Sequence, residues 1–137
     1  MRITPLVSVA GALSLAAAGC GAQTSVSAGK FKGDGKPVAQ AIDDLSSAGS
    51  KGDAKKICDS LLAKPVVQSL NQAGSDCQKA VKDQLKDADD FQLKVQSVTV
   101  NGTSATAKVK SQFNGKDHID TLGLVKEGPA WKIATLG

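Results

Sequence analysis

The 137-residue chain predicts a single α+β domain in which every helix precedes every strand. From Pro37 to about Ala88, apolar residues recur at the three- and four-residue spacing of amphipathic helices. After Asp90 the apolar period changes to two, which is the spacing of strands with one buried face. Asn-Gly and Gly-Pro pairs divide this second half into four runs, so we expect a four-stranded antiparallel sheet.

The first twenty residues have the pattern of a bacterial export signal. Their apolar run, from Leu6 to Ala18, is shorter than the roughly 20 residues that a membrane-spanning helix needs. The tetrapeptide Ala17-Ala18-Gly19-Cys20 resembles the lipobox of bacterial lipoproteins, in which the cysteine receives diacylglycerol and becomes the first residue. This resemblance implies a lipid anchor at Cys20 on the extracytoplasmic face of the cell membrane. The alternative is an ordinary secretion signal with an incidental cysteine.

Residues 20–36 have the composition of a flexible tether, because they are small and polar and show no apolar periodicity. We therefore divide the chain into a signal peptide (1–19), a lipidated cysteine with its tether (20–36) and a folded domain (37–137). Lysines at positions 30, 32 and 36 are placed to contact anionic lipid headgroups. The alternative is that these lysines belong to a solvated spacer.

Four helical segments are expected in the first half of the domain. The first begins at Pro37, which suits a first helical position, and Gly49 suits its stop. Asp53 is a good N-cap for the second, and Pro65 either ends that helix or opens a short third one. The fourth begins with the capping box Ser75-Asp76-Cys77-Gln78.

Two cysteines remain once Cys20 is assigned to the lipid. Cys58 and Cys77 each lie on the apolar face of a predicted helix, and an even number of cysteines in an exported chain indicates a disulfide. Metal binding or a redox pair is the alternative, but the chain has no CxxC motif and no histidine cluster. We therefore expect a structural disulfide between Cys58 and Cys77.

The second half predicts a curved sheet. Strands are expected at residues 91–100, 103–113, 116–126 and 131–136. Along the strands, apolar residues occupy every second position. This alternation shifts by one residue between Val95 and Val98, and again between Ile119 and Leu122, as it does at a β-bulge. Because bulges curl a sheet, one face should be concave, and the helices should pack into it.

Several local motifs carry a family resemblance. They are Gly52-Asp53 before the second helix, VTVNGTSATAKV at residues 98–109 and LVKEGPAWKI at residues 124–133. With these motifs, residues 37–137 resemble the small nuclear transport factor 2-like (NTF2-like) domains of actinobacterial lipoproteins. The resemblance implies a cone in which the curved sheet wraps around the helices and often leaves a pocket. It leaves the activity open, because this superfamily includes isomerases and dehydratases as well as proteins without chemistry.

Few residues of the domain could perform catalysis. The enzyme branches rely mostly on pocket Tyr, Asp and His residues, and this chain has no tyrosine and a single histidine. His118 and Asp120 share one side of a predicted strand, where the carboxylate could orient the imidazole. Their parity is opposite to that of Ile119, so both are expected outside if Ile119 points into the core, unless a bulge reverses the parity. With Asp117 they form a poor zinc set, and no metal or cofactor is expected.

The leading hypothesis is a lipid-anchored domain that binds without catalysis, holding either a small apolar ligand in the cone or another envelope protein on the outer sheet face. Phe113 and Trp131 are candidates to line the pocket. The alternative is a small isomerase or hydratase that uses His118 and Asp120. Nucleic-acid binding is disfavoured, because removal of Arg2 with the signal lowers the formal charge from +4 to +3 and leaves no arginine.

Overall fold

The computed structural model describes residues 27–87, 91–113 and 115–136; the predicted signal peptide and Cys20 lie outside them. Its helical elements are η1 (Ala28–Lys30), α1 (Gly35–Ser50), α2 (Ala54–Lys56), the π-helical turn η2 (Ile57–Leu61), α3 (Lys64–Gln72) and α4 (Cys77–Lys86). Its strands are β1 (Leu93–Asn101), β2 (Ser104–Phe113), β3 (Lys116–Glu127) and β4 (Ala130–Thr135). The strands form one antiparallel sheet in the order β1-β2-β3-β4, which confirms the predicted meander.

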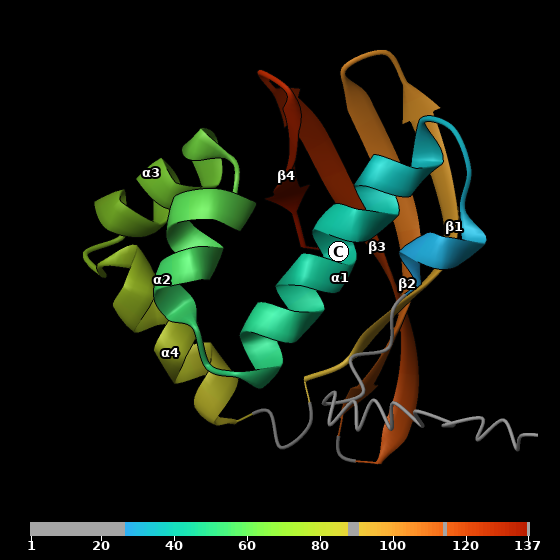
Figure 1. The fold of residues 1–137 in the computed structure, drawn as a ribbon. Helices are drawn as coiled ribbons and strands as arrows, with labels where there is room; N and C mark the ends of the chain where they lie inside the picture. The colour runs from blue at the N-terminus through green and yellow to red at the C-terminus, as the bar shows by residue number, and fades with distance from the viewer. Residues whose placement is uncertain (1–26, 88–90, 114, 137) are drawn as a thin grey trace, which may run out of the picture.

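Helix α1 lies across one face of the sheet, and α2, α3 and α4 gather beside it next to β4 (Figure 1). The core forms where α1 meets the sheet. Val38 and Ile42, one helical turn apart, are fully buried against the inward side chains of the strands, among them Val109, Leu124 and Ile133. This arrangement confirms the predicted α+β class, with helices on the concave face of the sheet.

Helix α1 extends beyond both predicted ends, which were Pro37 and Gly49. Gly49 is not a stop residue but a buried contact residue, because the ring of Phe91 lies where a Cβ at this position would be. The chain instead leaves the helical path at Gly52, whose φ of 67° favours glycine. A buried glycine and a turn glycine look alike in sequence, and the predicted stop was therefore wrong.

The sheet contains one of the two predicted bulges. The register between β1 and β2 shifts between Val95 and Ser97, as expected. The pairing of β2 with β3 is regular throughout, so the predicted bulge between Ile119 and Leu122 is wrong. Ile119 is 61% exposed, and the parity slip arises because an apolar residue faces solvent. A second register shift lies between β3 and β4, where Gly123 pairs with Thr135 and Leu124 with Ile133, so the extra residue belongs to β4.

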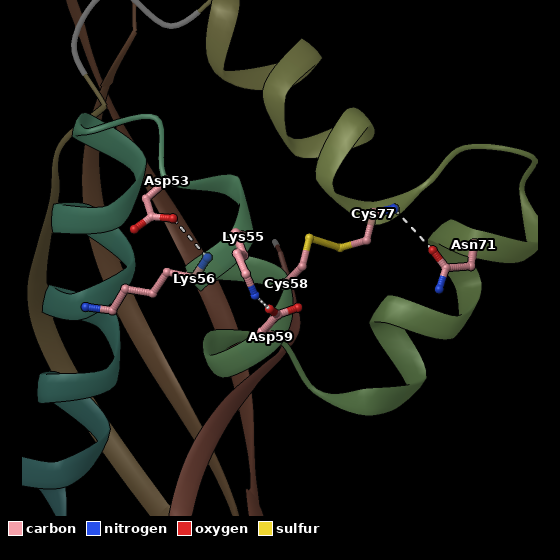
Figure 2. Close-up of a disulfide and its surroundings, with 7 residues drawn as sticks. All are labelled: Asp53, Lys55, Lys56, Cys58, Asp59, Asn71 and Cys77. Carbon is pink, nitrogen blue, oxygen red and sulfur yellow. Dashed lines mark hydrogen bonds and ion pairs between the residues drawn. A yellow bond between two sulfur atoms is a disulfide. The ribbon is translucent and has the colours of Figure 1, made fainter.

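A disulfide joins Cys58 of η2 to Cys77 of α4, with a Cα–Cα distance of 6.1 Å (Figure 2). The Asp53 side chain caps α2, as predicted, by accepting a hydrogen bond from the Lys56 backbone N–H at 3.0 Å. The expected capping box of the fourth helix does not form. Instead the Asn71 side chain accepts a hydrogen bond from the Cys77 backbone N–H at 3.1 Å. Helix α4 is therefore fixed at its first residue by a covalent bond and by a cap.

Residues 27–34, which we call the N-terminal strap, pack against α1 and β1. The backbone N–H of Ala28 donates a hydrogen bond to the buried Asp43 carboxylate of α1 at 2.7 Å. The Ser27 hydroxyl accepts one from the backbone N–H of Val95 at 3.1 Å. The folded domain therefore includes residues N-terminal to Pro37, where the sequence pattern places its start.

Both edge strands of the sheet have covered backbone groups. On β1, the Ser27 hydroxyl of the strap accepts a hydrogen bond from the backbone N–H of Val95. The hydroxyl of Ser46 in α1 accepts another from the backbone N–H of Leu93 at 3.0 Å. On β4, the carbonyl of Ile133 accepts from the backbone N–H of Ala63 at 2.8 Å. Such cover blocks the addition of a further strand at these positions.

Candidate functional site

A cavity of about 460 Å³ lies between α1, η2, α3 and α4. Its walls are mainly apolar, and they include Leu45, Ile57, Val66, Leu70, Val81 and Leu85. This volume falls within the range of about 300 to 1,000 Å³ that is typical of small-molecule sites. The cavity is therefore large enough for a small ligand.

The cavity exists because α3 and α4 cover the core incompletely. Each helix has an apolar stripe with a spacing of one turn, Val66 with Leu70 in α3 and Val81 with Leu85 in α4. None of these four side chains is fully buried. Apolar side chains that face one another at partial exposure leave space that an apolar ligand could fill.

Phe91 forms another part of the cavity wall and rests on α1 at Gly49. Three ring carbons of Phe91 lie within 2.9 Å of the position that a Cβ of residue 49 would occupy. A side chain at position 49 would therefore displace the ring and change the shape of the cavity. Leu136, which follows β4, also lines the cavity and is 64% exposed.

The cavity has few polar groups, and the charged one is Asp83 of α4. Lys86 and Lys79 donate hydrogen bonds to its carboxylate at 3.1 and 3.2 Å. These hydrogen bonds lower the pKa of Asp83 below the ordinary aspartate value. Asp83 is therefore ionised at neutral pH and already paired.

The disulfide holds one wall of the cavity in place. Helix α4 packs mainly on α2, η2 and α3, away from the sheet. Through Cys77 it is bound to η2, which contributes Ile57 to the lining of the cavity. The position of Val81 and Leu85 therefore depends on the covalent link.

A second cavity, of about 480 Å³, opens beside Cys58 and has a mixed lining that includes charged side chains. It includes Asp59, Lys64, Glu127 and Lys132. The Glu127 carboxylate accepts a hydrogen bond from the Lys64 backbone N–H at 3.1 Å, which uses this acid to cap the start of α3. The balanced charges make this cavity less suited to an apolar ligand than the one beside α4.

The predicted pair His118 and Asp120 lies on the face of the sheet that carries the core. In the regular register of β2 with β3, Asp120 pairs with the buried Val109, and His118 pairs with Ser111. The expectation that both point outward assumed a buried Ile119, and Ile119 is exposed. His118 is itself exposed, and neither residue is among those that line the apolar cavity.

Asp120 has a hydrogen-bond partner other than His118. The Ser111 hydroxyl donates to its carboxylate at 2.9 Å across the two strands. Within residues 27–87, 91–113 and 115–136, no hydrogen bond joins Asp120 to His118. In the same part of the chain, no three His, Cys, Asp or Glu side chains gather closely enough to hold a metal ion.

Of the two aromatic residues expected to line the pocket, Trp131 lines a different cavity from the one beside α4. Trp131 is buried and lines a smaller cavity of about 270 Å³, together with Asp34 and Pro37. The side chain of Phe113 lies outside the described ones. The aromatic residue of the apolar cavity is Phe91, which the sequence places at the start of a strand without marking it as a site residue.

Comparison with known proteins gives a family and two similar folds. A family model described as "Putative lumazine-binding" matches residues 67–136, about half of the chain, from α3 through β4. A SEC-C motif containing protein from Rhodopseudomonas palustris has a TM-score of 0.56 and 14% identity, with 75% of this chain and 86% of that chain covered. No curated protein matches the chain.

The second similar structure is a "Putative NTF2-like transpeptidase" from Campylobacter jejuni. It has a TM-score of 0.53 and 18% identity, with 72% of this chain and 97% of that chain covered. At these identities the two likenesses concern the fold alone. They agree with the cone-like arrangement expected from the sequence.

Proposed function

The chain belongs to the family described as "Putative lumazine-binding", with an NTF2-like fold, and from this premise we propose that it holds a small, largely apolar ligand in the cavity beside α4. We further propose that it does so as a lipoprotein, anchored through Cys20 on the extracytoplasmic face of the membrane. The lipobox motif supports the anchor. None of the described helices is both long and apolar enough to span a membrane.

The observation that carries the proposal is the apolar cavity itself. A protein partner that docked on the sheet would not need a space of about 460 Å³ between helices. The open face of the sheet is instead mainly polar, with Thr99, Thr106 and Lys108 exposed on it. Ile119 adds a large exposed apolar side chain to this face. A small ligand is therefore favoured over an envelope protein as the partner.

Binding without catalysis fits the composition and the geometry. The chain has no tyrosine, and its single histidine lies apart from the residues that line the cavity. Asp120 is engaged by Ser111 and not by His118. The pair is thus not arranged as an imidazole with an orienting carboxylate at the ligand site.

Filling the cavity tests the proposal. Replacing Ala80, which lines the cavity, by tryptophan should weaken binding of the neutral fluorophore N-phenyl-1-naphthylamine by about tenfold or more, because the indole occupies the space. Fluorescence titration measures the affinity, and circular dichroism checks the fold. Lumazine, a flat bicyclic heterocycle, should be tested as a competitor because of the family description.

Two controls accompany this titration. Lys82→Trp places the same side chain on an exposed position of α4, and His118→Ala removes the imidazole; both should bind the fluorophore as the unmodified chain does. Equal affinity of Ala80→Trp and the unmodified chain would contradict the assignment of the cavity. Weaker binding by His118→Ala would instead favour a site near the histidine.

A further inference from the structure

The strap connects the proposed anchor to the domain at a defined place. Its first described residue, Ser27, is buried and bound to β1 through Val95, and Ala28 is bound to Asp43 of α1. The chain from Cys20 therefore meets the domain beside the edge strand β1, on the side of α1 away from α3 and α4 (Figure 1).

We propose that the side of the domain that carries the strap and the first turn of α1, here called the strap side, faces the membrane. Lys30, Lys32 and Lys36 on this side contact anionic lipid headgroups, and the apolar cavity points away from the bilayer. This inference rests on the proposed anchor at Cys20. It goes beyond that anchor because it fixes the orientation of the domain. The ligand would then enter from the aqueous side and not from the lipid.

The length of chain between the anchor and the strap restricts rotation. Seven residue steps separate Cys20 from Ser27, and they reach at most about 25 Å when fully extended. A random coil of this length spans only about 13 to 16 Å. The domain is about 30 Å or more across, as expected for a compact fold of its size. Its far side, with α3 and α4, cannot replace the strap side at the membrane.

The charges on the strap side complement an anionic surface. Lys30, Lys32 and Lys36 are exposed, and Asp34 is the one acidic residue between them. None of the ion pairs found in the described part of the chain includes these three lysines. No described acidic side chain neutralises these ammonium groups, and each Lys near an anionic surface strengthens binding about fivefold.

Orientation can be measured on the chain from Cys20 onward, which contains every described helix and strand. This chain is coupled through Cys20 to a maleimide lipid in nanodiscs of phosphatidylcholine and phosphatidylglycerol that carry spin-labelled headgroups. The NMR signals of strap and β1 amides should lose most of their intensity, whereas α3 amides keep theirs. Uniform attenuation, or stronger attenuation in α3 and α4, would overturn the proposal.

Charge dependence is measured on the same chain with Cys20→Ser, so that no anchor contributes. Replacing Lys30, Lys32 and Lys36 by glutamine should weaken binding to phosphatidylglycerol vesicles at least tenfold. The matched control replaces three exposed lysines elsewhere, Lys51, Lys56 and Lys82, and should change binding less than twofold. Equal losses in the two triple variants would contradict a role for the strap.

The anchor is tested separately, by the mass of the N-terminal peptide from chain purified from membranes. A diacylglycerol mass on Cys20 supports the anchor. Its absence would overturn the proposed anchoring in the cell, and the nanodisc result would still decide whether the strap side faces a bilayer.

Discussion

Replacing both Cys58 and Cys77 by alanine is expected to lower the free energy of unfolding by about 3 kcal/mol. The disulfide closes a loop with a sequence separation of 19 residues, and the loss follows from the greater freedom of the unfolded chain without this link. Urea titration measures the effect, and the corresponding fall in melting temperature is about 12 to 24 °C. Because α4 is fixed by Cys77, affinity for N-phenyl-1-naphthylamine should fall as well.

Reduction of the unmodified chain with dithiothreitol is the matched control, and it should reproduce most of the loss without any substitution. The double variant should show no further change on reduction. If its unfolding free energy lies within about 0.5 kcal/mol of the oxidised chain, the disulfide does not stabilise the domain.

Replacing Gly49 by alanine is the second large effect that we expect, a loss of about 1 to 3 kcal/mol in unfolding free energy. The new methyl group would overlap the ring of Phe91. This net loss already includes an opposing gain of about 1 kcal/mol, because alanine favours the helix over glycine, so the overlap itself costs about 2 to 4 kcal/mol. Since Phe91 lines the apolar cavity, fluorophore affinity should fall together with stability.

Gly29→Ala is the control, because nothing lies within 4 Å of the position that its Cβ would take. It should change the unfolding free energy by no more than about 0.5 kcal/mol. A Gly49→Ala chain that is as stable as the unmodified one would show that Phe91 does not rest on α1 as described.

The sequence predicts the strands better than the ends of the helices. Turn glycines with positive φ, such as Gly102 and Gly128, mark two of the hairpins directly, because few other residues adopt that conformation. Gly49 gave a wrong helix end, since the sequence does not distinguish a glycine that makes room for a neighbouring ring from a glycine that forms a turn. The contact with Phe91 spans 42 positions along the chain and becomes visible only in the fold.

The face occupied by His118 shows why parity alone cannot assign a site. Parity assigns sides correctly only relative to a residue whose side is known, and Ile119 was the wrong reference because it faces solvent. Leu122 and Leu124, which are buried on the same strand, give the observed assignment. The hydrogen bond from Ser111 to Asp120 depends on register between strands, which local sequence does not specify.

The apolar cavity could be anticipated only in part. The stripes of α3 and α4 are evident from their helical spacing, and the resemblance to NTF2-like domains implies a pocket. Whether two stripes close on each other or leave a space depends on how α4 is held, through the disulfide and the cap from Asn71. The burial of the strap could not be predicted from the local sequence either, because its hydrogen-bond partners are Asp43 and Val95, which lie far along the chain.

Native mass spectrometry of the chain purified from its own membranes tests the central claim, that the cavity beside α4 holds a small ligand. We expect a noncovalent small-molecule mass on the unmodified chain and on Lys82→Trp, and its loss from Ala80→Trp. A bare unmodified chain with its disulfide intact, or the same adduct on Ala80→Trp, would contradict the claim.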